Sequence, residues 1–418
     1  MKTRAASIAC ALLACCCASA ADLYKAVRTP IKAPDCVTDP SQSFFADNVT
    51  QREMPHDILP RGRYYLVVRY LGDDAVSEPA DYDFGRFADD HADADLRGAP
   101  ITGLTVPGNR ATWQRARRSN ATPDDSSAFQ LHCDHAGSFI NSWTFPYRQL
   151  ASEGPHAVYA YDFNAASRPA VFDANPSTDF GLEASIEIPW FRTWIDPQST
   201  NAIPPIGQVS VFAYFRDRAT GKPFALLLDI FDNRYAEVLG YPTHVSHDTE
   251  TPFVSIPLNR RAKYATPYPK AAQFTGTAWS GLKLFGARIS QRQFRAAIDD
   301  INAFCAMHRD LAHCASTLPS NAAFGVDVRN YELTSFGVLH EIFGTDTRNH
   351  LSMGVHVARL GAWNFRAIPS AGPSTRRSIA AAGSSRAPAC GPTAASAGTI
   401  GRKDAQARAF RRAFRTCA

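Results

Sequence analysis

The sequence lacks the patterns that would place it in a familiar class. No stretch of about 20 unbroken apolar residues is present, so we expect no transmembrane segment. There is no C-x-x-C pair, so zinc-knuckle and thioredoxin-like sites lack their motif. P-loop, G-x-G-x-x-G and G-x-S-x-G motifs are also absent, and no internal repeat is visible. We therefore expect no cofactor, and look for function in the pattern of the strands.

The chain begins like an exported protein. Two basic residues precede an apolar run that ends in Ala-Ser-Ala, which is the order of a secretory signal peptide. We expect residues 1–20 to be this signal, and the protein to be secreted or periplasmic in a bacterium. The alternative is a lipoprotein signal that leaves Cys15 lipidated, but Leu13 fits that motif poorly.

The cysteines agree with export. Six of the ten lie beyond residue 20, an even number that is typical of structural disulfides. Cys305 and Cys314 flank a short loop, so we expect them to pair with each other. The remaining cysteines of the body then predict a Cys36–Cys133 disulfide, and the pairing of the two tail cysteines stays open.

The charge is unevenly divided along the chain. Residues 367–418 hold nine basic residues and one acidic residue, and residues 1–20 add two basic ones, so the formal net charge of +5 leaves −5 for residues 22–366. The basic balance belongs to the tail, and we therefore expect no nucleic-acid partner. The tail is rich in Ala, Ser, Gly, Pro and Arg and is expected to be disordered. Its end, 403–418, has the pattern of a short basic helix that would suit an anionic surface, although a solvated extension without function is the favoured interpretation.

The body, residues 22–366, is predominantly β in its pattern, with room for a subdivision near residue 150. Short connections join 208–216 to 223–231 and 336–344 to 350–357, which predicts two hairpins. Strand-like segments rich in Val, Ile, Phe and Tyr lie at 63–74, 184–190, 208–216, 223–231, 336–344 and 350–357.

One helix is predicted over residues 290–306. Ser290 and Gln293 have the spacing of a capping box, and a single apolar stripe follows. A single stripe suits a helix packed against a sheet. The predicted fold is therefore mainly β: an antiparallel β-sandwich, or jelly roll, with one amphipathic helical insert.

Alternation along the strands predicts one apolar face and one mixed face. We place Trp190 on the apolar face, together with Val211 and its alternate neighbours. The mixed face combines aromatic rings, which stack on sugars, with groups that hydrogen-bond hydroxyls, and so suits a glycan. The alternative is that a helix or another sheet covers this face. The predicted ligand-binding residues are Phe212, Tyr214, Arg216, Asp229, Phe231, His350 and His356, and Glu187 shares their face.

The strand FGVLHEIFG leaves one choice open, because either His340 or Glu341 can join the mixed face. Glu341 with Asp229 or Glu187 would provide two carboxyl groups for glycoside hydrolysis. His340 with a tyrosine and an arginine would suit proton abstraction from a uronate, as in a lyase. The catalytic candidates are therefore Glu187, Asp229, His340 and Glu341.

The segment YPTHVSHDTE, residues 241–250, contains four potential metal ligands. Its H-x-x-H-D order differs from the helical H-E-x-x-H of metalloproteases, so we expect an exposed polar loop and no metal. The function that the whole pattern favours is an exported protein that binds a polysaccharide or oligosaccharide. The alternatives are a glycoside hydrolase or lyase that uses the same face, and a structural or adhesive envelope protein.

Overall fold

The computed structural model falls into two units, Met1–Ile368 and Pro369–Ala418, and the described residues belong to the first. The expectations for the signal peptide, the tail and the Cys36–Cys133 disulfide therefore lie outside the described residues. Before residue 120 the structure describes backbone strands: β1 (Ala26–Pro30), β2 (Phe44–Asp47), β3 (Tyr64–Arg69), β4 (Tyr82–Arg86), β5 (Asp95–Leu96), β6 (Ala99–Pro100) and β7 (Gln114–Arg118). Beyond them it describes residues 125–131, 135–144, 154–174, 177–199, 204–235, 242–248, 250–344, 346 and 348–367.

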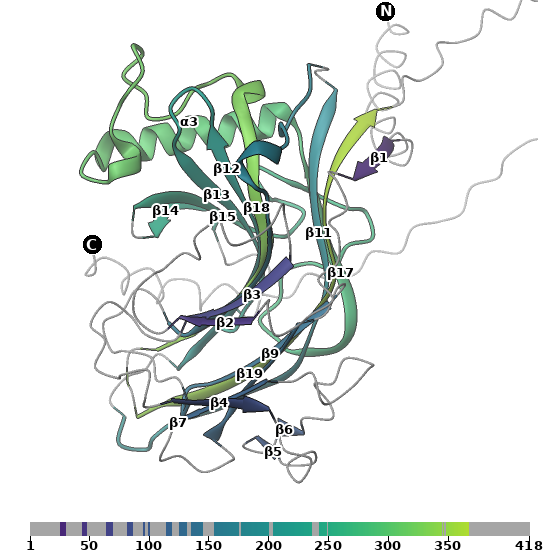
Figure 1. Ribbon diagram of the computed structural model, residues 1–418, viewed down its shortest axis with the longest axis vertical. Coiled ribbons are helices and arrows are strands. Elements are labelled where there is room, and N and C mark those ends of the chain that lie inside the picture. The colour runs from purple at the N-terminus through teal and green to yellow at the C-terminus, as the bar shows by residue number, and fades with distance from the viewer. Residues whose placement is uncertain are drawn as a thin grey trace, which may run out of the picture. The chain divides into compact units, whose positions relative to one another are not determined.

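The strands form two large sheets, which Figure 1 shows as two layers. All described pairings within them are antiparallel except β13–β15 and β2–β3; β5 and β6 pair only with each other. Sheet A has the order β16 (Thr266–Pro267), β17 (Trp279–Ile289), β11 (Thr178–Trp194), β19 (His350–Ala367), β9 (His135–Asn141), β8 (Ser127–Leu131), β7 and β4, and β1 pairs with β19. Sheet B has the order β14 (His244–Asp248), β15 (Thr251–Pro257), β13 (Pro223–Asp232), β12 (Ile206–Asp217), β18 (Tyr331–Phe343), β10 (His156–Asp162), β3 and β2.

The inner faces of the two sheets share one hydrophobic core. Val211 of β12 and Val355 of β19, whose neighbours in the chain face outward, are 1% and 2% exposed. Rings from the two sheets meet edge to face, as Phe180 of β11 and Phe215 of β12 do at 5.5 Å between centroids. The predicted mainly β sandwich is therefore confirmed, with its core where the alternation of the strands places it.

The helix α3 (Gln291–Met307) confirms the predicted insert, and Figure 1 shows it beside β12, β13, β14 and β15. Ser290 is its N-cap, and both hydrogen bonds of the capping box with Gln293 are present. The buried stripe includes Phe294, Ile298, Ile301 and Cys305. Three short 3-10 turns accompany the helix and strands in the described residues: Ala165–Ser167, Ala312–Cys314 and Val328–Asn330.

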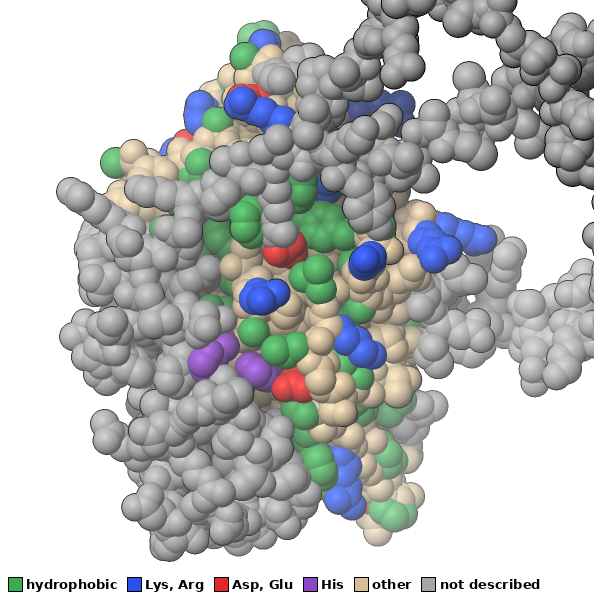
Figure 2. Space-filling view, turned by 90° about the vertical axis from the view of Figure 1, so that its right-hand side faces the viewer, with side chains coloured by type: hydrophobic (Ala, Val, Ile, Leu, Met, Phe, Trp, Pro, Cys, Tyr) green, Lys and Arg blue, Asp and Glu red, His purple; other side chains and the backbone are tan. Residues whose placement is uncertain are grey.

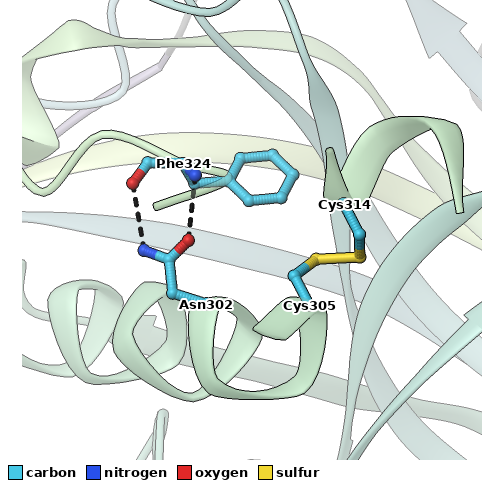
Figure 3. Close-up of a disulfide and its surroundings, with 4 residues drawn as sticks. All are labelled: Asn302, Cys305, Cys314 and Phe324. Atoms are coloured by element: carbon cyan, nitrogen blue, oxygen red, sulfur yellow. Dashed lines mark hydrogen bonds between the residues drawn. A yellow bond between two sulfur atoms is a disulfide. The ribbon is translucent and has the colours of Figure 1, made fainter. Parts of the chain in front are cut away.

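Two cross-links attach the segment that follows α3 to the helix (Figure 3). Cys305 and Cys314 form a disulfide, which is the pairing that their short loop predicts. Asn302 donates from Nδ2 to the Phe324 carbonyl and accepts from the Phe324 amide. A long irregular segment is thereby held against one helix face.

The prediction of two hairpins is half right. β12 and β13 pair as a hairpin. β18 and β19 do not pair, because β18 lies between β12 and β10 in sheet B while β19 lies between β11 and β9 in sheet A. The short link between them crosses from one sheet to the other, and Asn349 ties it to the turn after β11 by accepting from the Asp196 amide.

Candidate functional site

The structure divides the predicted mixed face between the two sheets. We call the face of each sheet that points away from the shared core its outer face. Glu187, His350 and His356 lie on the outer face of sheet A, on β11 and β19. Tyr214 and Asp229 lie on the outer face of sheet B, on β12 and β13. Because the outer faces of a sandwich point in opposite directions, the structure does not bring these residues together.

A β-bulge removes Phe231 from the face on which alternation places it. The register between β12 and β13 shifts by one residue between Val209 and Ser210. Phe231 therefore shares the inner face with Val209, is 0% exposed and lies 5.4 Å from the Phe191 ring. The expectation that it shares the face of Tyr214 is wrong, because one extra residue in a strand reverses the alternation.

A second bulge has the opposite effect on Trp190. Glu187 pairs with His356 and Trp190 pairs with Gly354, so β11 has one residue more than β19 in this interval. Trp190 consequently lies on the outer face of sheet A and is partly exposed, which corrects its predicted place on the apolar face. Pro189 precedes it, and proline within a strand commonly marks a bulge.

Asp229 is on the outer face of sheet B, but the residue is only 1% exposed. Ser210 Oγ donates to it at 2.6 Å, and Ser255 Oγ donates to its other oxygen. Burial raises the pKa of Asp229 to about 6, although the two serine bonds act in the other direction. This carboxyl group is paired internally, so a ligand would have to displace a serine to reach it.

The other residues predicted for this face differ in accessibility. Phe212 is 3% exposed, and its ring lies over Gly337, where an added Cβ would come within 2.6 Å of Phe212 Cζ. Tyr214 is partly exposed beside it, with 5.4 Å between the ring centroids. Arg216 is exposed and donates from Nε to the Gly221 carbonyl at 3.0 Å. Of these three, Tyr214 and Arg216 offer surface to a ligand.

Glu341, rather than His340, joins the outer face of sheet B, which settles the choice that alternation leaves open. Its Oε1 accepts from the Gly154 amide at 3.1 Å. Burial, with a smaller contribution from the negative charge of Asp248, raises the pKa of Glu341 to about 7, although the hydrogen bond from the Gly154 amide acts in the other direction. Asp229 and Glu341 are therefore two carboxyl groups with raised pKa values on one face, on strands separated by β12.

His340 points into the core between the sheets and is 2% exposed. Its Nδ1 is 2.8 Å from Ser138 Oγ on β9 of sheet A. Burial first, and then the charge of nearby His156, lower the pKa of His340 to about 3. This histidine is a buried neutral group away from either outer face.

On the outer face of sheet A, Glu187 and His356 form a pair. His356 Nδ1 and Glu187 Oε1 are 2.8 Å apart, and Glu187 Oε2 accepts from the Gly281 amide at 2.6 Å. His356 is 6% exposed, and its Nε2 is buried with no hydrogen-bond partner in the described part of the chain. The His135 ring stands edge-on to it at 6.1 Å between centroids. The pair fixes the histidine ring through one nitrogen and leaves the other unmatched.

Next to this pair lies a cluster of four partly exposed aromatic side chains and one exposed arginine, which we call the tryptophan shelf. The Trp143 ring stacks on the His350 ring, 4.0 Å apart and 14° from parallel. Trp194 stands edge-on to Trp143 at 4.6 Å, and the Arg192 guanidinium lies 4.8 Å from the Trp194 ring centroid. Trp190 completes the shelf. Its members are Trp143, Trp190, Arg192, Trp194 and His350.

Two serines, one on β19 and one in the turn after β9, position the rings of the shelf. Trp190 Nε1 donates to Ser352 Oγ at 2.8 Å, and Ser142 Oγ lies 3.1 Å from His350 Nδ1. Trp190, Arg192 and Trp194 alternate with inward-facing residues along β11, so they follow one another on one face. Figure 2 views the side on which β11 and β17 lie in Figure 1, where histidine, acidic and basic side chains lie among hydrophobic ones.

Sequence reasoning found His350 but missed the rest of the shelf. A usable pattern was present: WFRTW, residues 190–194, continues the alternation beyond the proline with Trp, Arg and Trp at every second position. Trp143 has no such pattern, because it follows β9 in a turn and reaches the shelf only through the pairing of β9 with β19.

The segment predicted to be an exposed polar loop forms β14 at the edge of sheet B. His247 and Asp248 are exposed there. The described residues contain no group of three or more potential metal ligands. None of the helices described is long and apolar enough to cross a membrane.

Comparison with known proteins gives little. No family model and no curated protein matches this chain. Among solved structures, the crystal structure of a loop-swap mutant of Necallimastix patriciarum Xyn11A matches with 8% sequence identity and a TM-score of 0.25. The match covers 62% of this chain and 94% of that chain. A match at this TM-score carries no argument about function.

Proposed function

We propose that this chain is an exported glycan-binding protein, and that the tryptophan shelf is its binding surface. The observation that carries the proposal is the continuous contact of Trp143 with His350 and with Trp194, all three partly exposed. Export is supported by the signal-like start of the chain and by the disulfide, since disulfides persist in oxidising compartments.

The chemistry of the shelf suits sugars. Indole rings present large apolar faces on which the C–H face of a pyranose stacks, and neighbouring polar groups can hydrogen-bond to its hydroxyls. Because each indole is held by a ring contact or a hydrogen bond, little side-chain entropy remains to be lost on binding. A preformed aromatic surface of this kind favours recognition without a large conformational change.

A glycan array probed with the labelled full chain, followed by calorimetry on each positive glycan, tests the proposal. Trp194→Ala should weaken binding by about 1–3 kcal/mol, the scale of a lost aromatic contact, with little change in the unfolding temperature. Phe191→Ala is the matched control from the same strand, because its ring contacts Phe231 in the core. It should lower stability by about 2–4 kcal/mol and leave the affinity of the folded protein unchanged.

The variant Tyr214→Ala distinguishes binding to the outer face of sheet B from binding to the outer face of sheet A. If Tyr214→Ala weakens binding while Trp194→Ala does not, the glycan binds to sheet B and the shelf is not the site. If no glycan binds on the array, glycan binding itself is wrong.

A second function, a glycoside hydrolase or lyase, is favoured by one observation on sheet B. Asp229 and Glu341 share a face, and burial raises their pKa values to about 6 and about 7. A carboxyl group that is still protonated near neutral pH is what a general acid requires. Reducing-sugar and unsaturated-product assays on array-positive polysaccharides test it, and Glu341→Gln should abolish any product.

A chain that neither binds glycan nor releases product would fit the third function, a structural or adhesive envelope protein.

A further inference from the structure

We propose that the tryptophan shelf selects acidic glycans, with Arg192 as the residue that binds a sugar carboxylate. This inference rests on the proposed function, since it names the class of ligand for the same surface. Two observations support it: the position of Arg192 among the indole rings, and the lack of an acidic partner for this exposed side chain in the described residues.

Arg192 lies at the centre of the shelf. It stands between Trp190 and Trp194 on the outward-facing positions of β11, opposite Ser352 on β19. Alternate residues of a strand are about 7 Å apart, so the three side chains extend over roughly 14 Å of the surface. A sugar ring that stacks on either indole therefore places its substituents within reach of the guanidinium.

The guanidinium of Arg192 is unused. Within the residues that the structure describes, it makes no hydrogen bond or ion pair, and it lies 4.8 Å from the Trp194 ring centroid. Other arginines are engaged: Arg234 lies 2.6 Å and Arg348 lies 2.8 Å from an aspartate oxygen. The contact with the indole holds the guanidinium of this exposed side chain beside the Trp194 ring. A guanidinium that has no acidic partner can bind a carboxylate in a bidentate manner.

Among the described residues, the acidic side chains along β11 are paired with groups other than Arg192. Just beyond the end of β11 the Asp196 side chain accepts from the Gln198 amide, and its charge acts on Arg348. Glu187, at the other end of the row, is engaged with His356 and Gly281. The shelf therefore combines indole faces with a positive charge that has no acidic partner in the described part of the chain, and the ligand that complements both is a sugar with a carboxylate.

Calorimetry on the full chain with matched ligands tests this inference. The probes are oligosaccharides of galacturonate, of mannuronate and of hyaluronan, each compared with its carboxyl-reduced form, which keeps the rings and loses the charge. We expect at least one acidic probe to bind about tenfold or more tightly than its reduced form, with an affinity that falls as salt rises. Arg192→Gln should abolish that preference, and Arg192→Lys should retain only part of it because lysine keeps the charge without the planar fork.

The outcomes separate the inference from the proposed function. If acidic and reduced probes bind equally, or if Arg192→Gln leaves the preference intact, the inference is overturned while glycan binding stands. If no probe binds, and the array is also negative, the proposed function is wrong and the inference falls with it. If Trp194→Ala leaves the affinity for every probe unchanged, the ligand does not lie on the shelf, which also overturns both.

Discussion

Ser138 and His340 belong to different sheets, and a hydrogen bond of 2.8 Å between Ser138 Oγ and His340 Nδ1 joins them through the core. His340 is 2% exposed, and its pKa is lowered from 6.5 to about 3, chiefly by burial. The folded protein therefore keeps this histidine neutral under conditions in which the unfolded chain takes up a proton.

The first prediction is a loss of stability in acid that depends on His340. Because the folded pKa is below the unfolded one, the contribution is complete above pH 6.5 and falls as the pH is lowered toward 3. At pH 5 the loss should be about 2 kcal/mol. Urea unfolding at pH 5 and pH 7.5 measures it, and His340→Asn, which keeps a polar group but does not titrate here, should lack this part of the difference. Parallel pH curves for wild type and variant would contradict the assignment.

The second prediction concerns Glu341, for which the sign is reversed. Its folded pKa of about 7 is above the unfolded value of 4.5, so the stability that it contributes is present below pH 4.5 and is lost as the pH rises to 7. Glu341→Gln retains an acceptor for the Gly154 amide and has no charge to bury. Between pH 4.5 and pH 8 the wild type should lose about 1–3 kcal/mol more than the variant, after allowing for the solvent that reaches this side chain. Chemical denaturation at the two pH values decides the matter.

The third prediction concerns the cysteines. Replacing Cys305 and Cys314 by alanine should lower the free energy of unfolding by about 2–3 kcal/mol, the value for a loop of this length, while the Asn302 bonds still hold the segment. Denaturation of the double variant tests this.

Non-reducing peptide mapping should also find Cys36 joined to Cys133, and a peptide that links Cys36 to Cys305 or Cys314 would refute that pairing.

The fourth prediction concerns the start of α3. Ser290→Ala removes the acceptor for the Gln293 amide and should lower stability by about 1 kcal/mol. Ser290→Asp supplies another side-chain acceptor and should restore most of the loss. Thermal unfolding of the two variants side by side provides the comparison, and equal losses would show that the cap contributes nothing.

Much of the fold could be predicted because its signals are local. The period-2 alternation of β12 and β13 and the apolar stripe of α3 are properties of a few consecutive residues, so the sequence alone predicts them. The sheet to which a strand belongs is not local. β18 and β19 are close in the chain, but hydrogen bonding to distant strands places them in different sheets.

The site was harder to predict for a related reason. Alternation places a side chain on a face only while the strand count is unbroken, and one extra residue moved Phe231 inward and Trp190 outward. The bulge in β11 has a local sequence signal, because Pro189 lies at this point of the strand. The bulge in β13 had none that we can identify, and the approach of Trp143 to β19 is a tertiary contact.

The position of β19 has a consequence for how the chain reaches its native state. β19 is the last strand described, yet it lies at the centre of sheet A and is the strand that joins β11 to β9. During synthesis, β9 and β11 emerge long before the strand that pairs with both. Until residues 350–367 leave the ribosome, sheet A consists of two separate halves with open edges, and the pairing that joins them has a long sequence separation. A nascent or prematurely terminated chain that ends before His350 should therefore require protection from aggregation.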